Sequence, residues 1–104
     1  MQIIETSAFT RRVAELLSDE DYRALQTTLV ENPEVGAVIV GTGGARKVRW
    51  AAQGRGKSGG VRVIYYYATA RGVILMLTVY AKSDQDTLTD AQKKALRAII
   101  VGSG

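Results

Sequence analysis

Two long runs of β-branched and aromatic residues constrain the fold of this chain more than any other feature. The runs are Val61–Ala68 and Val73–Ala81, and residues of these types favour β-strands. Ala70-Arg71-Gly72 between them predicts a short turn, and therefore an antiparallel hairpin. Lys47–Ala51 is a further strand candidate, and Ile3-Ile4 adds a short one near the start of the chain. The sequence thus predicts a twisted, mainly antiparallel sheet of three or four strands.

Apolar residues at helical spacing predict helices before and after this sheet. One helix is expected over about Ser7–Leu17, and a second begins after the N-cap Ser18 and ends at Asn32-Pro33. Thr89, followed three residues later by Gln92, is a capping-box pattern that opens a short C-terminal helix. A chain of 104 residues is long enough for one core. We therefore expect a single α+β domain in which two N-terminal helices pack on the sheet.

Alternation along the strands sorts their side chains onto two faces. The face expected to pack against the N-terminal helices is apolar and consists of Val48, Trp50, Val63, Tyr65, Tyr67, Leu75, Leu77 and Val79. The opposite face gathers cations and a tyrosine: Lys47, Arg49, Arg62, Tyr80 and Lys82. Ile64, Ile74 and Met76 are expected on that second face too. Part of it must therefore be covered by the C-terminal helix or by a partner protein.

The charges of the chain are unevenly distributed. The net charge is only +4, yet residues 35–83 contain no Asp or Glu and eight of the fourteen Lys and Arg. Arg46 belongs to this block, and so do Arg55 and Lys57, which lie in a glycine-rich segment that can approach a nucleic acid closely. A dense block of one sign predicts a polyanionic partner such as RNA. The alternative is a solvated surface that happens to be basic.

Several classes of function are excluded or disfavoured. The sequence has neither Cys nor His, which removes disulfides, thiolate metal sites and the usual general base. The basic block offers no carboxylate cluster for Mg²⁺, so we expect neither a metal nor a small-molecule cofactor. The segment Gly56–Gly60 resembles a phosphate-binding loop, but it leads into a strand where that motif requires a helix. We see no signal peptide and no apolar run of about 20 residues, so a cytoplasmic location without membrane association is expected.

Three stretches of the chain carry a family resemblance. They are residues 41–50, residues 54–66, and residues 77–82 with their continuation to the helix start at Leu88-Thr89. In order and spacing they resemble the RelE/HigB-like toxins of bacterial type II toxin–antitoxin systems, the HigB branch most closely. The match is specific from Gly41 to about Ala95, whereas the first 35 residues match only in pattern.

The resemblance implies a ribosome-dependent mRNA endonuclease, or mRNA interferase, that a cognate HigA-like helix-turn-helix antitoxin neutralises. Lys47 and Arg49 match the paired basic residues of one family strand. Arg62 matches the arginine that opens the next strand, and Lys82 matches the basic residue after the last. Many relatives carry a catalytic tyrosine in the C-terminal segment, but this chain has no aromatic residue after Tyr80. Either Tyr80 substitutes, or no tyrosine is used.

Cleavage of RNA by its own 2′-hydroxyl requires a base, stabilisation of the phosphorane, and a proton or charge for the leaving oxygen. Repulsion by neighbouring cations favours the neutral amine of a lysine, so Lys47 or Lys82 can act as the base. Arg49 and Arg62 can hold phosphate oxygens bidentately. Arg46, Arg55 and Lys57 are expected to bind the RNA or the ribosome, and the side chains of Arg62 and Lys57 are expected to be exposed.

Two other functions fit the same sequence. A ParE-like toxin on the same fold would poison gyrase by protein contact and cleave nothing. A non-enzymatic RNA-binding domain would use the basic face for affinity alone. The basic positions on the strands favour the nuclease, because rigidly held cations can stabilise a transition state.

Overall fold

The computed structural model describes residues 1–51 and 60–103. The elements, in chain order, are β1 (Gln2–Glu5), α1 (Ser7–Leu16), α2 (Asp19–Glu31), β2 (Ala37–Val38), β3 (Arg46–Trp50), β4 (Val61–Ala68), β5 (Val73–Ala81) and α3 (Asp90–Ser103). The strands form one five-stranded sheet in the order β1-β5-β4-β3-β2. β1 runs parallel to β5, and the other neighbouring strands are antiparallel. The prediction of an α+β fold with a mainly antiparallel sheet is confirmed, with the two-residue β2 as an additional strand.

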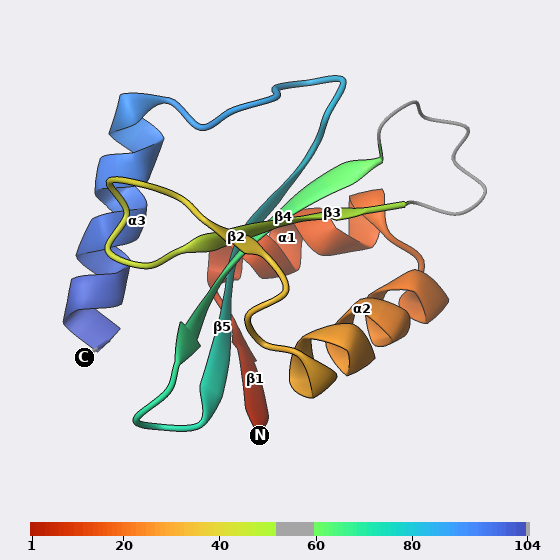
Figure 1. The fold of residues 1–104 in the computed structure, drawn as a ribbon. Coiled ribbons are helices and arrows are strands. Elements are labelled where there is room, and N and C mark those ends of the chain that lie inside the picture. The colour runs from red at the N-terminus through yellow and green to blue at the C-terminus, as the bar shows by residue number, and fades with distance from the viewer. Residues whose placement is uncertain (52–59, 104) are drawn as a thin grey trace.

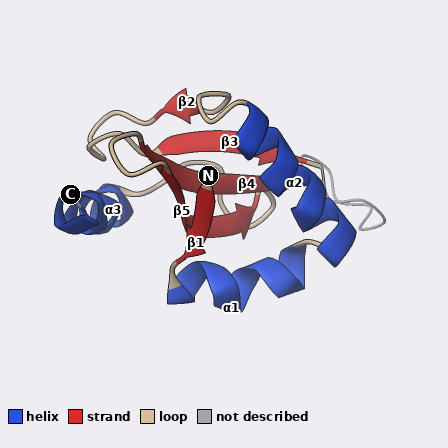
Figure 2. Ribbon diagram, turned by 90° about the horizontal axis from the view of Figure 1, so that it is seen from below, coloured by secondary structure: helices blue, strands red, loops and turns tan. Residues whose placement is uncertain are grey.

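The helices divide between the two faces of the sheet. α1 and α2 lie together along one side, and α3 stands apart from them (Figures 1 and 2). A main core joins the helical hairpin to the sheet through Phe9, Val13, Leu17, Leu25, Leu29, Val61, Val63, Tyr65, Ile74, Met76 and Val79. A second cluster under α3 contains Ala45, Ile64, Leu77, Tyr80, Leu88, Leu96 and Ile100. Of the two covers expected for part of the second face, the C-terminal helix or a partner protein, the structure shows the helix.

Side-chain caps fix where the helices begin. The hydroxyl of Ser18 accepts a hydrogen bond from the backbone N–H of Asp21 at 3.0 Å, as its N-cap role requires. The backbone N–H of Gln92 donates to the Thr89 hydroxyl at 3.1 Å, and the Gln92 side-chain oxygen accepts from the Thr89 N–H at 2.9 Å. This reciprocal pair is the predicted capping box. The helix that it opens, α3, has 14 residues and is longer than expected.

A bulge in β5 places some of its side chains on the face opposite to the predicted one. Ile64 pairs with Thr78, but the next residue of β4 pairs with Met76, which leaves Leu77 as an extra residue. An inserted residue reverses the alternation on one side of it. Met76, and with it Ile74, therefore points into the main core, whereas Leu77 and Leu75 lie on the α3 side. The prediction placed these four residues on the opposite faces. It was wrong because it assumed that side chains alternate without interruption along β5.

A buried tyrosine ties the segment after α2 to the sheet. The Tyr65 hydroxyl donates to the carbonyl oxygen of Pro33 at 2.8 Å and accepts from the backbone N–H of Gly36 at 2.9 Å. A Cβ atom at Gly36 would come within 2.9 Å of both this hydroxyl and the carbonyl oxygen of Lys47. Only glycine allows so close an approach. The contact holds the chain that leads into β2 against the start of β3.

We predict that Tyr65→Phe lowers the free energy of unfolding by about 1–3 kcal/mol, because it leaves the buried N–H of Gly36 and the partly buried carbonyl of Pro33 without this partner. Tyr67→Phe is the control, since Tyr67 lies two residues along the same strand and is half-buried. We expect it to change the free energy by less than about 0.5 kcal/mol. Urea unfolding of both variants measures the difference, and equal losses would contradict this role of Tyr65.

Candidate active site

Three polar residues line up across three adjacent strands. Arg49 on β3 pairs with Arg62 on β4, and Arg62 pairs with Tyr80 on β5. Side chains directly opposite one another in a sheet point to the same face, with Cβ atoms about 4.5–5.5 Å apart. We call Arg49, Arg62 and Tyr80 the cross-strand row. Lys47, which is paired with Ile64 two residues farther along β4, lies on the same face.

The row is exposed at β3 and buried at β4 and β5. Arg49 is exposed, whereas Arg62 is only 3% and Tyr80 only 4% exposed. The expectation that Arg62 is an exposed side chain was therefore wrong. Its strand, β4, is the central strand of the five. Strand alternation specifies the face of a side chain but not what covers that face.

An acidic residue from outside the basic block reaches the row. The nearest oxygen of the Asp86 carboxylate lies 3.8 Å from an Nη atom of Arg62. Asp86 is itself 69% exposed, so the ion pair joins a buried cation to an anion at the surface. Asp86 was not among the predicted site residues, and its only signal in the sequence is its position a few residues after the last strand.

Tyr80 has the least usual environment in the row. Its hydroxyl oxygen is buried and has no hydrogen-bond partner among the residues that the structure describes. Burial raises the pKa of Tyr80, with a smaller upward effect from Asp86 and a downward one from Arg62. The phenol is therefore protonated at neutral pH. Buried polar groups normally have partners, so this O–H is an exception among the described residues.

The two candidate lysines differ in how well the fold positions them. Lys47 is half-buried and has its place in the register of β3. Lys82 is exposed and lies in the turn that follows β5, where its backbone N–H donates to the carbonyl oxygen of Gly60 at 3.1 Å. β5 ends at Ala81. Strand alternation therefore does not fix the direction of the Lys82 side chain.

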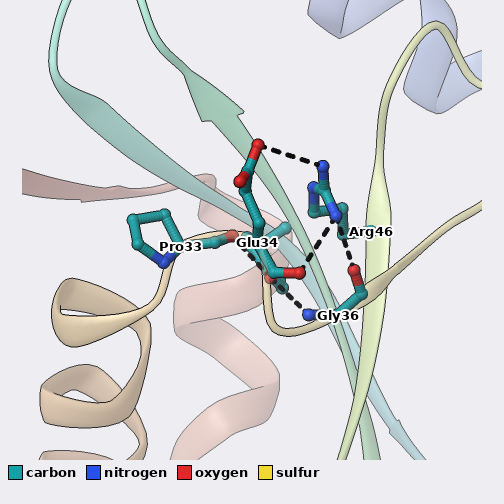
Figure 3. Close-up of polar contacts among 5 residues, drawn as sticks. Pro33, Glu34, Gly36 and Arg46 are labelled. Carbon is teal, nitrogen blue, oxygen red and sulfur yellow. Dashed lines mark hydrogen bonds and ion pairs between the residues drawn. The ribbon is translucent and has the colours of Figure 1, made fainter.

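Arg46 lies on the opposite face of β3 from Lys47 and Arg49. It is paired with Tyr65, and its Nη1 donates to the carbonyl oxygens of Glu34 at 3.2 Å and Gly36 at 2.8 Å. Its Nη2 also lies 3.8 Å from the Glu34 carboxylate (Figure 3). These contacts hold the segment after α2. The structure thus does not bring Arg46 to the cross-strand row.

The other candidates for RNA contact, Arg55 and Lys57, lie outside the described residues. Within 1–51 and 60–103, no group of three or more acidic side chains could hold a metal ion. No helix in the same ranges is long and apolar enough to cross a membrane.

A family model described as the RelE toxin of the RelE/RelB toxin–antitoxin system matches residues 1–101. The chain belongs to this RelE toxin family. The fold of this RelE-family chain is similar to the toxin in the crystal structure of the intact E. coli RelBE toxin–antitoxin complex. The TM-score is 0.60 at 17% identity, with 77% of this chain and 94% of that chain covered.

A second similar structure is a mutant of E. coli toxin RelE in the free state. Its TM-score is 0.58 at 17% identity, with 82% of this chain and 86% of that chain covered. At such identities the structural similarity shows a shared fold.

We predict that Tyr80→Phe leaves the free energy of unfolding unchanged or raises it by up to about 1 kcal/mol, because it removes a buried hydroxyl that has no partner within residues 1–51 and 60–103. Urea unfolding of Tyr80→Phe and Tyr65→Phe compares the loss of the hydroxyl from two buried tyrosines. A loss of more than about 1 kcal/mol for Tyr80→Phe would mean that its hydroxyl is satisfied within the folded protein.

Proposed function

We propose that this RelE-family toxin is an endoribonuclease that cleaves mRNA on the ribosome by attack of the RNA 2′-hydroxyl. The observation that carries the proposal is the cross-strand row with Lys47 on the same face. Two arginines and a protonated phenol, held by three strands, form an arrangement suited to a phosphate with growing negative charge. Sheet strands fix these groups more rigidly than loops would.

The two arginines have different parts in this proposal because their exposure differs. Arg49 is exposed and can contact the phosphate of an incoming RNA in the ground state. Arg62 is buried in the central strand, and its planar guanidinium presents several N–H donors in a fixed geometry. Its fixed guanidinium is suited to the phosphorane, in which the equatorial oxygens carry more charge than in the substrate.

The chemical step uses Lys47 and Tyr80 as proton acceptor and donor. In this proposal the side-chain nitrogen of Lys47 takes the proton of the 2′-hydroxyl as the bond from O2′ to phosphorus forms. The bond from phosphorus to O5′ breaks, and the Tyr80 O–H gives its proton to the leaving O5′. The products are a 2′,3′-cyclic phosphate and a free 5′-hydroxyl. Each step uses a side chain of this chain, and none requires a metal ion.

The ribosome is proposed to supply the alignment that a small site cannot. Holding the 2′-hydroxyl in line with the leaving oxygen can contribute several powers of ten to the rate. A toxin with few substrate contacts can then be active on ribosome-bound mRNA and weak on free RNA. Action on ribosomes would also place the protein in the cytoplasm.

The proposed inhibitor is a cognate antitoxin. The similar fold in the E. coli RelBE complex supports a partner of this kind. The stretch from Gly41 to about Ala95 resembles the HigB branch most closely, which favours a HigA-like helix-turn-helix protein. The order of the two genes and the sequence of the neighbouring reading frame test this assignment.

We predict that Arg49→Ala lowers the single-turnover rate of mRNA cleavage on programmed ribosomes by about 10²-fold at subsaturating toxin, because a phosphate contact made before and during the reaction is lost. The control is Arg11→Ala, which also removes one exposed positive charge but lies on α1, on the other side of the sheet. The rate for that variant should stay within about threefold of wild type. Equal rates for Arg49→Ala and wild type would contradict the assignment of the row.

The ends of the products and the cellular target separate this proposal from its rivals. We expect 5′-hydroxyl ends and mapped cuts in mRNA after expression of the toxin. Growth arrest with double-strand DNA breaks and intact mRNA would instead indicate a gyrase poison. Binding of RNA without any cuts would indicate a non-enzymatic RNA-binding domain.

A further inference from the structure

The buried part of the cross-strand row presents a problem for any phosphate ligand. Arg62 and Tyr80 are almost fully covered. A guanidinium in this state cannot contact an RNA phosphate unless a covering group moves. The identity of that group decides how the site becomes accessible.

The segment between β5 and α3 brings one acidic group to Arg62. We call residues 82–89 the strap; it returns from the end of β5 to the start of α3 (Figure 1). The strap is anchored near its α3 end by the buried side chain of Leu88. The Gln85 side-chain amide also donates to the Gln92 side chain of α3 at 2.8 Å. Asp86 lies between these two anchors and is the strap residue paired with Arg62.

The contact of Asp86 with Arg62 is loose. Its 3.8 Å separation is longer than the 2.7–2.9 Å typical of charge-assisted hydrogen bonds. The carboxylate is largely exposed, and ion pairs open to solvent contribute little to stability. Asp86 is also not the only group that interacts with Arg62. Displacement of the carboxylate therefore costs little and does not leave the arginine without partners.

A carboxylate and a phosphate can both accept charge-assisted hydrogen bonds from a guanidinium. We propose that the strap is an autoinhibitory cover, in which the Asp86 carboxylate occupies the position of an RNA phosphate on Arg62 and must be displaced by it. The inference rests on the proposed function, because that function makes a phosphate the ligand of the row. Free toxin is then partly blocked by its own acid, and binding of RNA opens the strap.

The test measures affinity for RNA apart from cleavage. The probe is a short 2′-O-methyl RNA, which lacks the attacking hydroxyl, in buffer of about 0.1 M salt. Asp86→Asn removes the competing charge and should bind the probe at least about fivefold more tightly than wild type. Asp84→Asn is the matched control. It removes an equal charge from an exposed residue of the same strap that has no ion pair with a described residue.

The control should bind the probe within about twofold of wild type, because salt screens charges that are not in contact with the ligand. Equal gains for both variants would mean a general charge effect and overturn the inference. Weaker binding by Asp86→Asn would overturn it too, since Asp86 would then orient Arg62 for the ligand. Absence of binding by all three proteins would also overturn it, because the row would then hold no phosphate.

Two further measurements keep the outcome clear. Asp86→Ser provides a second neutral replacement, and urea unfolding checks that both variants fold. Tight binding by Asp86→Asn without cleavage on ribosomes would support the strap and contradict the nuclease. Cleavage by all three proteins with equal probe affinities would support the nuclease and contradict the strap.

Discussion

The alignment of the cross-strand row depends on β4 pairing with β3 and β5 in unbroken register at one end of the sheet. The bulge at Leu77 lies beyond the pairs that join Arg62 to Tyr80 and Val63 to Val79. A bulge three residues later would have turned Tyr80 toward the helical hairpin and left Arg62 without its neighbour. The same register leaves Ile64 and Leu77 facing α3, which explains why the second core lies directly beside the polar row.

The buried polar groups of the cross-strand row lower the stability of the fold. A buried arginine with a loose ion pair opposes folding, and so does a buried phenol without a hydrogen-bond partner among the described residues. The two apolar clusters, one on each side of the sheet, hold these groups in place. Such local conflicts in an otherwise consistent fold are typical of functional sites. Tyr65 is the contrast, because it is also buried but its hydroxyl is hydrogen-bonded to two backbone groups of the segment after α2.

Features with local causes could be predicted from the sequence. The N-caps Ser18 and Thr89 correctly predicted where α2 and α3 begin. The two apolar runs predicted β4 and β5 with the bounds that the structure shows. The bulge could not be predicted, because apolar residues occupy both faces of β5 and either register buries them. β2 has two exposed residues and no periodic signal. Burial of Arg62 and its contact with Asp86 depend on the path of the strap, which tertiary packing determines.

The central claim is that the Tyr80 hydroxyl protonates the leaving oxygen while the arginines hold the phosphate. A substrate with sulfur in place of the bridging 5′-oxygen tests it most directly, because a thiolate leaves without a proton. Single-turnover cleavage on ribosomes should be about 10²-fold slower for Tyr80→Phe with the normal mRNA. With the 5′-thio mRNA, the variant should match the wild type. An equal loss on both substrates, or no loss on the normal one, would contradict this role of Tyr80.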